Sequence, residues 1–294
     1  MTATELRPED TPFAPLDWGF MLGAAVIWGG SFLFMAIGLD AFEPGVVTFL
    51  RVGFGCLALL PLRSSRRAIP REDLPKVVLL GVTWMAFPLT MFPIAQQWLD
   101  SSVAGMLNAG MPLMTVLISW SIFHTPTGPR RLAGVGVGLI GILCIGIPEA
   151  STAGTNAVGV GILVLAVVSY GVAVNIAGPL QQRHGSLPVI TRALGVATVL
   201  TLPYGLVGVP ESSFAWDSLI ACFVVGAGGT GLAFVFMGNL TGRVGAVRAS
   251  LVTYVIPVIS IALGVAFRDE TVTIAAVIGT MIVLLGAYLS SRVE

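Results

Sequence analysis

The chain has 294 residues, of which 55% are hydrophobic and only 10% are charged, and its mean hydropathy is +0.93. A soluble domain carries about 25% charged residues, so this composition indicates an integral membrane protein and excludes a soluble fold. The formal net charge is zero, which gives no indication of a nucleic-acid partner.

Apolar segments recur from Trp18 to the C-terminus, and a helical span of the bilayer needs about 20 apolar residues. Residues 1–17 are polar and acidic and lack the basic-then-apolar order of a signal peptide, so we expect a retained cytoplasmic tail. The loops are too short for a separate soluble domain. Breaking the sequence at charged and Pro/Gly-rich clusters predicts ten helices, over residues 18–39, 45–62, 75–97, 102–123, 131–147, 157–178, 188–208, 217–239, 245–267 and 272–290.

Lysine and arginine are unequally distributed between the two sets of predicted loops. The loops after the odd-numbered predicted helices hold only Arg268, among many acidic residues. The positive-inside rule therefore predicts a multi-pass protein of a bacterial-type cytoplasmic (inner) membrane with both termini in the cytoplasm. The cationic side consists of the termini and the loops after the even-numbered helices, with Arg7, Arg63, Arg66, Arg67, Arg71, Lys76, Arg130, Arg131, Arg183, Arg243, Arg248 and Arg292.

The chain also contains an internal repeat with a register of 145 residues. This register predicts two five-helix repeats, over 18–150 and 151–294. Because five is an odd number, the second copy must be inverted in the membrane, and inverted repeats build transporters whose site lies near the midplane. The matched positions are Gly81 with Gly226, Ala104 with Ala249, Pro112 with Pro257, Gly134 with Gly279, and Gly141 with Gly286.

Pro112 and Pro257 give this register a chemical meaning. A proline inside a helix removes the hydrogen bond to the carbonyl four residues earlier. These carbonyls belong to Asn108 and Thr253, which are also 145 residues apart. Each half should therefore place a bent helix, a freed carbonyl and a polar side chain about 15 Å into the bilayer. We predict that these four residues form a substrate site; the alternative is two packing kinks whose polar side chains bond neighbouring helices.

Aromatic residues at mid-depth are further candidates for the site. Trp28 and Tyr170 precede glycines at corresponding places in the first and sixth helices, and Trp84 and Tyr254 lie on the third and ninth. Buried Trp and Tyr prefer a polar partner, and this depth is far from the interfacial aromatic belts. Lining of a site and ordinary core packing both remain open for them. Met111 is expected among the apolar residues around a substrate side chain.

Arg51 is the only charged residue well inside a predicted span, and intramembrane charges are functional candidates. It also lies about 9 Å along its helix from the outer end. That distance permits snorkelling, or an ion pair with an acidic group at the rim such as Glu43. We therefore include Arg51 among the site candidates but favour a structural role.

Several motifs together carry a family resemblance. The first helix reads Trp28-Gly-Gly-Ser-Phe32, and Pro44 in the second is followed seven residues later by Arg51. With the repeated Ala…Pro…Gly…Gly spacing, the chain resembles the drug/metabolite transporter superfamily with two EamA-type repeats, and within it the ten-helix amino-acid exporters of the YddG type. Many such proteins carry glutamate at the outer end of helix nine or the inner end of helix four. Here those positions are Asp269 and His124, so no role for that glutamate is expected.

All fifteen Asp and Glu residues fall in termini, loops or the first turns of predicted helices. Proton-driven carriers generally use an intramembrane carboxylate or histidine, so we expect a carrier that facilitates downhill export. A phosphorylated substrate would need several Lys or Arg partners. A neutral amino acid or similar zwitterion fits better, because its ammonium group can contact freed carbonyls and aromatic faces.

The favoured function is a secondary transporter that exports small neutral metabolites, most of all amino acids, by alternating access around a central cavity. A multidrug, amine or other metabolite carrier of the same superfamily and a channel-like pore are the alternatives, although no carbonyl filter or ring of charges is visible. No metalloprotease or nucleophile-elbow motif occurs, so we expect neither catalysis nor a cofactor. The expected partners are a small-molecule substrate and the lipid bilayer, and a monomer is sufficient.

Overall fold

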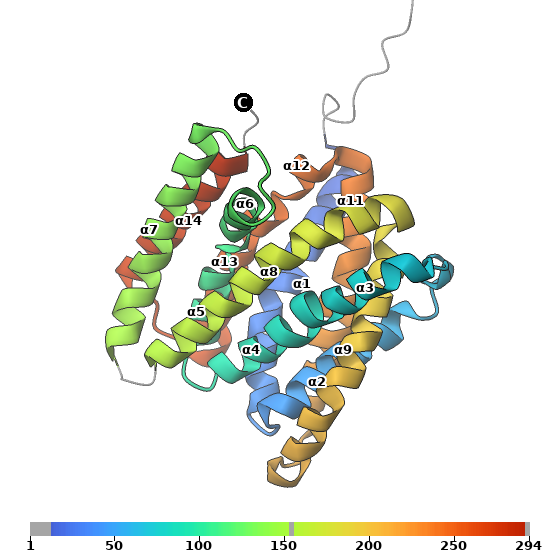
Figure 1. Cartoon of the computed structure of the whole chain (residues 1–294). Coiled ribbons are helices and arrows are strands. Elements are labelled where there is room, and N and C mark those ends of the chain that lie inside the picture. The colour runs from blue at the N-terminus through green and yellow to red at the C-terminus, as the bar shows by residue number, and fades with distance from the viewer. Residues whose placement is uncertain (1–12, 153–155, 292–294) are drawn as a thin grey trace, which may run out of the picture.

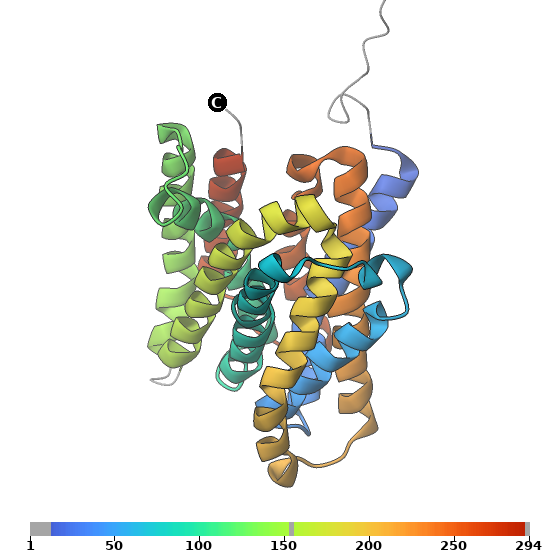
Figure 2. The ribbon, with the colours of Figure 1, turned by 45° about the vertical axis from the view of Figure 1, so that its right-hand side comes forward.

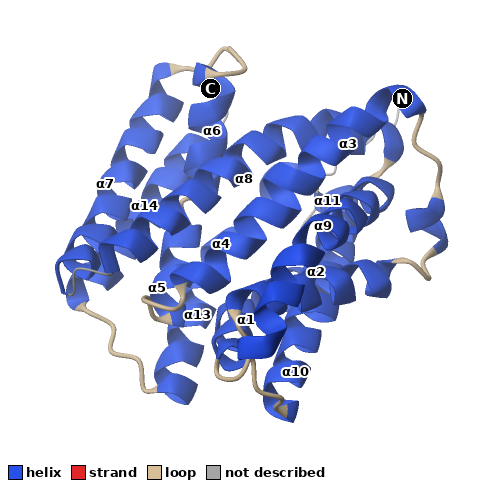
Figure 3. Ribbon diagram, turned by 60° about the horizontal axis from the view of Figure 1, so that its bottom comes forward, coloured by secondary structure: helices blue, strands red, loops and turns tan. Residues whose placement is uncertain are grey.

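The computed structural model describes residues 13–152 and 156–291, and every regular element within them is helical (Figure 3). In Figure 1, α7 and α14 run side by side along one edge of the bundle, and α8 crosses its face. In chain order the elements are α1 (Pro15–Leu39), α2 (Pro44–Leu59), η1 (Arg63–Arg66), η2 (Arg71–Asp73), α3 (Leu74–Leu80), η3 (Gly81–Ala86), α4 (Phe87–Ala95), α5 (Ser101–Asn108), α6 (Met111–Ser121), α7 (Pro129–Thr152), α8 (Asn156–His184), α9 (Ser186–Gly208), η4 (Val209–Glu211), α10 (Trp216–Phe223), η5 (Val224–Leu232), α11 (Ala233–Val244), α12 (Ala246–Ala249), α13 (Val252–Arg268) and α14 (Ile274–Ser291).

The predicted all-helical membrane fold is confirmed. Within the described residues, eight helical segments are long and apolar enough to cross a membrane, and the shorter apolar helices α2 and α13 complete the ten predicted spans. The boundaries differ most where a proline was expected to end a helix. Helix α7 continues through Pro148 and α8 continues through Pro179, because packed transmembrane helices tolerate internal prolines. Residues 1–12 of the predicted tail lie outside the described residues.

The fourth and ninth spans are broken rather than bent. Helix α5 ends at Asn108 and α6 begins at Met111, so Pro112 lies in the first turn of α6, where its missing N–H leaves no bond unmade. In the second repeat the break lies between Ala249 and Val252, and Pro257 is inside α13. The proline therefore directly follows the break in the first repeat, whereas in the second repeat it lies within α13, beyond the break.

The third and eighth spans each contain a π-helical segment, η3 and η5. A π-helix closes its hydrogen bonds over five residues instead of four, which widens the turn and redirects the side chains. The two segments contain the matched glycines Gly81 and Gly226. Each π segment packs on the second helix of the other repeat, η3 against α9 and η5 against α2.

Equivalent elements of the two repeats make equivalent contacts. Helix α1 packs on α13 and α8 packs on α6, while α7 and α14 pack on each other. A Cβ atom built on Gly226 would lie 2.7 Å from the carbonyl oxygen of Arg51, and one on Gly81 would lie 3.1 Å from that of Ala193. Arg51 and Ala193 therefore occupy corresponding positions, 142 residues apart.

The ends of the chain agree with this inverted arrangement. Helix α1 begins and α14 ends at the same end of the bundle, at the top of Figure 2. This end also holds the loops that follow α2, α6, α8 and α11. These loops carry most of the Lys and Arg residues, so we call it the arginine-rich end. The opposite end, where α1 passes into α2 and α13 into α14, is called the acidic end.

Candidate functional site

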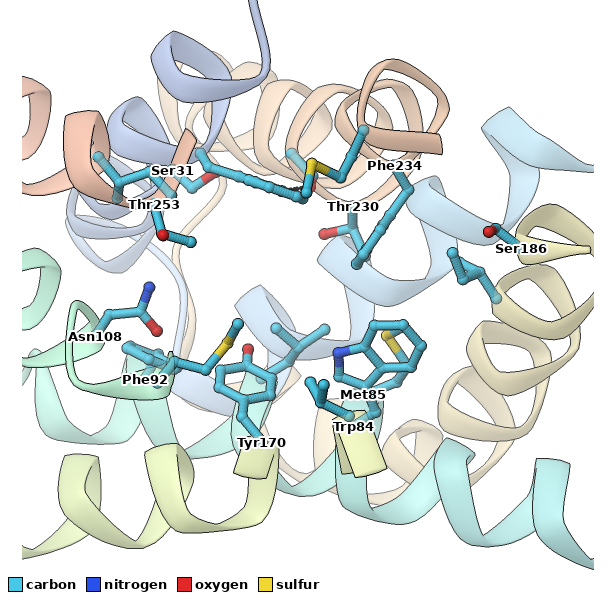
Figure 4. A pocket seen from close by; sticks show the side chains of 18 of the residues that line it. Ser31, Trp84, Met85, Phe92, Asn108, Tyr170, Ser186, Thr230, Phe234 and Thr253 are labelled. Carbon is cyan, nitrogen blue, oxygen red and sulfur yellow. Dashed lines mark hydrogen bonds between the residues drawn. The ribbon is translucent and has the colours of Figure 1, made fainter. Parts of the chain in front are cut away.

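A cavity of about 390 Å³ lies inside the bundle, within the range of roughly 300–1,000 Å³ that is typical of small-molecule sites. Figure 4 shows polar and aromatic side chains pointing into it from several helices. Among the described residues its lining includes one charged side chain, Arg51, and no Asp, Glu, Lys or His. A solute in this cavity would meet mainly aromatic, thioether, hydroxyl and amide groups.

The cavity lies on the axis that relates the two repeats, because its lining comes largely in repeat-related pairs. The paired lining residues on α1 and α8 are 142 positions apart in the sequence, and the pairs on the other helices are 145 positions apart. The paired lining residues are Trp28 with Tyr170, Phe32 with Val174, Trp84 with Gly229, Met85 with Thr230, Leu89 with Phe234, Phe92 with Met237, Asn108 with Thr253, and Met111 with Ile256.

Most of the residues predicted from the sequence are brought together at this cavity. Those that line it are Trp28, Arg51, Trp84, Asn108, Met111, Tyr170 and Thr253. Pro112, Tyr254 and Pro257 are not among the lining residues. Pro257 is buried within α13 and its carbonyl accepts a hydrogen bond from the Ser260 hydroxyl at 3.1 Å, while Tyr254 packs against the hydrophobic core.

Asn108 and Thr253 face the cavity from neighbouring positions (Figure 4). The Thr253 hydroxyl donates to the carbonyl of Ser250 at 2.6 Å, so it helps to close the turn at the break before α13. The Asn108 side chain lies at the corresponding break and makes no side-chain hydrogen bond within the described residues. Its amide is therefore available to a solute as both donor and acceptor.

An aromatic cluster forms a second part of the wall. The indole N–H of Trp28 donates to the carbonyl of Gly229 at 2.9 Å. The ring of Phe234 packs edge-on against both Trp28 and Trp84, with ring centroids 5.6 and 5.5 Å apart. This hydrogen bond and these ring contacts fix the orientation of the aromatic faces.

Arg51 lies deeper than its position along α2 suggested. Its side chain is only 7% exposed, and its Nε donates to Thr230 Oγ1 at 3.1 Å. Its Nη1 lies 2.9 Å from the Met35 sulfur. The expected snorkelling or pairing with Glu43 is wrong, because α2 packs on η5 and directs the guanidinium to the centre of the bundle.

At the acidic end, aromatic and polar contacts close the bundle between the cavity and that end. Phe32 and Phe92 pack with their ring centroids 5.7 Å apart. The Gln96 side chain donates to the carbonyl of Phe32 at 3.1 Å. Arg268 makes two hydrogen bonds to the Asp40 carboxylate, at 2.7 and 3.0 Å, which connects α13 to the end of α1.

A glutamate also contributes to this closure, contrary to the expectation from Asp269. The Glu270 carboxylate accepts hydrogen bonds from the backbone N–H groups of Ser101 and Ser102, both at 2.9 Å, and from the Ser101 hydroxyl at 2.6 Å. Partial burial raises the pKa of Glu270, but these hydrogen bonds outweigh burial and hold its pKa below the ordinary value. Burial and the nearby Glu270 charge raise the pKa of Asp100. We call the Glu270 contacts with Ser101 and Ser102 the acidic-end latch.

Toward the arginine-rich end the cavity continues. It is lined there by Gln181 near the end of α8, Ser186 at the start of α9, and Thr241 near the end of α11. These residues have no repeat-related counterparts in the lining at the acidic end. The cavity is therefore asymmetric: it is closed at the acidic end and extends to the arginine-rich end.

Sequence reasoning missed several lining residues, including Ser31, Phe92, Thr230 and Phe234. The repeat register pairs Thr230 with Met85 and Phe234 with Leu89, but only the packing of both π segments shows that these faces point inward. A polar residue in a glycine-rich stretch such as Gly226–Gly231 was the available signal for Thr230.

Comparison with known families agrees with the duplicated architecture. The model of the EamA-like transporter family matches residues 18–147 and again residues 157–292. The chain belongs to the EamA-like transporter family. The two matches together cover most of the described bundle.

Relatives of this EamA-like transporter are similar along nearly their whole lengths. The uncharacterized transporter YoaV of Bacillus subtilis is 21% identical over 92% of this chain and 95% of the relative. A probable terminal-alkyne amino-acid exporter of Streptantibioticus cattleyicolor is 24% identical, covering 94% and 93%. A probable amino-acid metabolite efflux pump of Salmonella typhimurium is 22% identical, covering 92% and 94%. One crystal structure, 19% identical, matches with a TM-score of 0.63 over 93% of this chain and 96% of that one, which shows the shared fold.

Proposed function

We propose that this membrane transporter exports small zwitterionic metabolites, neutral amino acids above all, by alternating access. The observation that carries the proposal is the cavity on the repeat axis, closed at the acidic end and reaching the arginine-rich end. By the positive-inside rule the arginine-rich end, with both termini, faces the cytoplasm of a cell whose inner membrane holds the protein. The described conformation then loads its solute from the cytoplasm.

An asymmetry between the repeats supports alternating access. Gly29 of α1 lies against Ile256 and Ile259 at the start of α13, whereas Gly171 of α8 lies against Met114 and Ile118 of α6. In the repeat register, this second contact is displaced by about one helical turn, or roughly 5.4 Å. Exchange of these two packings between the repeats would close the arginine-rich end and open the acidic end, as inverted repeats allow.

The cavity chemistry favours a zwitterion. Trp28, Trp84 and Tyr170 present aromatic surfaces that attract an ammonium group. Asn108 offers an amide with free donors and acceptors, and Thr253 offers a hydroxyl oxygen beside it. Two of the relatives are named as amino-acid or amino-acid metabolite exporters, which agrees with a solute of this class.

Pro112 and Pro257 are proposed to act through the backbone rather than by contact. Pro112 begins α6 directly after the break that carries Asn108, and Pro257 stiffens α13 after the break that precedes Thr253. Tyr254 is proposed to support Thr253 from the core side. Met111 and its repeat partner Ile256 supply apolar surface for the solute side chain.

Reconstitution of the purified full-length protein into liposomes tests this function. A panel of labelled neutral amino acids, organic amines and sugar phosphates is offered with and without a pH gradient. We expect saturable, mutually competitive flux of neutral amino acids that does not require the pH gradient. Flux of sugar phosphates without amino acids would overturn the substrate class, an obligatory pH gradient would overturn uncoupled export, and non-saturable flux would favour a channel-like pore.

A further inference from the structure

We infer that Arg51 and Thr230 form a subsite for the carboxylate of the transported solute; this inference rests on the proposed function and narrows its substrate class. Arg51 is the one charged side chain among the described lining residues. The subsite lies where α2 crosses the π segment η5. Its charge selects solutes that carry a carboxylate over amines that lack one.

The guanidinium has no countercharge in the described chain. The titratable groups near enough to interact electrostatically with it are Tyr170 on α8 and Cys222 on α10, both neutral at physiological pH. Its other neighbours are the Met35 thioether, a weak acceptor, and the Thr230 hydroxyl. A buried charge without an anionic partner is unfavourable, so an anion entering the cavity would gain strongly from contact with Arg51.

Two donors of the guanidinium are held and the rest remain available. Nε is bound to Thr230 Oγ1, and one N–H of Nη1 points to Met35. Nη2 makes no hydrogen bond within the described residues, and the side chain lines the cavity. The guanidinium therefore keeps N–H donors on Nη1 and Nη2 for a solute, and a planar guanidinium can bind a carboxylate through two parallel hydrogen bonds.

The π segment fixes Thr230 in the position that this subsite requires. The Thr230 hydroxyl donates to the carbonyl of Val225, five residues earlier, at 3.1 Å, so its oxygen lone pair faces Arg51. Gly55 and Gly226 permit the close approach, since a Cβ on Gly55 would lie 2.9 Å from Thr230 Cβ. The guanidinium is therefore held before any solute arrives, which lowers the entropic cost of binding.

This arrangement separates the two solute classes that the cavity could otherwise accept. An amino acid would neutralise Arg51 with its carboxylate and leave its ammonium near Trp28 and Tyr170, which line the same part of the cavity. An organic amine would bring a second positive charge close to Arg51 and leave the guanidinium unpaired. Electrostatic repulsion in this low-dielectric site disfavours the amine.

The test measures selectivity in liposomes that contain the full-length protein. Flux of labelled tryptophan and leucine is competed by matched analogues that lack the carboxylate charge, namely tryptamine, tryptophanamide and isoamylamine. In the wild-type protein we expect the amino acids to compete at least tenfold better than these analogues. Equal competition by amides and amines would overturn the carboxylate subsite without any variant being made.

Substitution of Arg51 then tests the residue itself. R51M should weaken the apparent affinity for tryptophan by roughly 30-fold or more and remove the preference over tryptophanamide, because one member of a buried charge pair is lost. R51K should retain part of the preference. The matched control is R192Q, which removes an arginine that binds the Ser65 and Arg67 carbonyls away from the cavity, and it should leave the preference intact. An unchanged preference in R51M would overturn the inference.

The outcomes distinguish this inference from the proposed function. If no labelled amino acid moves through the wild-type protein, the proposed function fails. If amino acids move but loss of the carboxylate makes no difference, only the role of Arg51 fails. If Arg51 had a purely structural role, R51M would lower the melting temperature and would reduce the flux of every solute equally. The ratio between amino-acid and amide flux would then stay unchanged.

Discussion

The stretch 51–59 of α2 and the stretch 193–201 of α9 have the same sequence of buried, half-buried and exposed positions, residue for residue. Each packs on the π segment of the other repeat. The first position is Arg51 in one stretch and Ala193 in the other. Arg51 donates a hydrogen bond to Thr230 in η5, and the repeat partner of Thr230 in η3 is Met85. The two repeats thus share one scaffold and differ in the chemistry placed on it.

For the proposed amino-acid solute, this difference would give a symmetric backbone two unlike sides. An amino acid has a charged end and a side chain, and the two sides of the cavity differ in the same way. Arg51 and Thr230 make one side polar, whereas Met85 and Leu89 keep the related region on the other side apolar. Helix packing requires only that small residues recur where the helices cross, so the polar residues were free to diverge.

The largest expected effect comes from filling the two matched glycines. G226A would place a Cβ 2.7 Å from both Arg51 O and Phe54 Cβ, and G81A would place one 2.6 Å from a Val196 methyl. Each should destabilise the fold by about 1–3 kcal/mol, measured as a lower melting temperature in detergent. Only G226A should also weaken amino-acid transport selectively, because only its helix crossing carries Arg51.

The control for this pair is G161A. A Cβ at Gly161 meets nothing within 4 Å, and alanine is favoured over glycine in a helix by about 1 kcal/mol. It should leave stability the same or slightly higher. Equal loss of selectivity in G81A and G226A would contradict the assignment of the asymmetry to Arg51.

The next effect isolates the hydroxyl that holds Arg51. T230V keeps the shape of Thr230 but removes the acceptor for Arg51 Nε and the donor to Val225 O. A hydrogen bond to a charged group contributes about 1.5–3 kcal/mol, so the apparent affinity for amino acids should fall about tenfold or more. The control T48V removes a different buried hydroxyl, that of Thr48 in α2, which donates to Pro44 O at 2.8 Å. A drop of the same size in T48V would show that general destabilisation is the cause.

The fold was largely predictable from the sequence for physical reasons that act locally. Apolar length sets the spans, arginine distribution sets their expected orientation, and matched glycines and prolines mark the repeat. Asn108 and Thr253 were found because each lies four residues before a proline and the two are repeat partners, 145 residues apart. Both line the cavity.

What escaped prediction depends on how helices cross. The position of Arg51 was judged by its distance along α2, but its surroundings are set by η5 and α8. The π segments arise from packing and have no reliable local signal. Glu270 was missed because Asp269 adopts a left-handed conformation, with φ of 53°, that ends α13 and turns the next carboxylate back toward α5.

A smaller effect is expected at the acidic end, where the repeats differ again. Glu270 forms the acidic-end latch, whereas the residue 145 positions earlier is Thr125. E270Q should increase hydrogen exchange at the start of α5 by about tenfold, since an amide oxygen is a weaker acceptor for Ser101 and Ser102. D100N is the control and should not accelerate exchange, because the Asp100 carboxylate makes no capping hydrogen bond to the amides at the start of α5.

The same latch has a defined pH dependence. Because the folded protein holds the pKa of Glu270 below its ordinary value of 4.5, the ionised carboxylate stabilises the latch fully above that value. The stabilisation should be lost as the pH falls through the lowered pKa. After correction for the intrinsic pH dependence of amide exchange, the protection of the amides at the start of α5 should therefore fall on acidification in the wild-type protein and stay nearly flat in E270Q. A flat wild-type profile would contradict the latch.

The smallest expected effect is at the exposed ion pair beside the latch. Arg268 and Asp40 are 34% and 49% exposed, and water and salt screen a pair of this kind, so D40N should change stability by less than about 1 kcal/mol. The change should diminish further in high salt, because the screening length shortens. The partly buried latch should keep most of its effect under the same conditions. If D40N loosened the acidic end as much as E270Q, the closure there would depend on surface charge and not on the carboxylate bound to the start of α5. Melting temperatures and exchange rates of both variants at low and high salt distinguish these two cases.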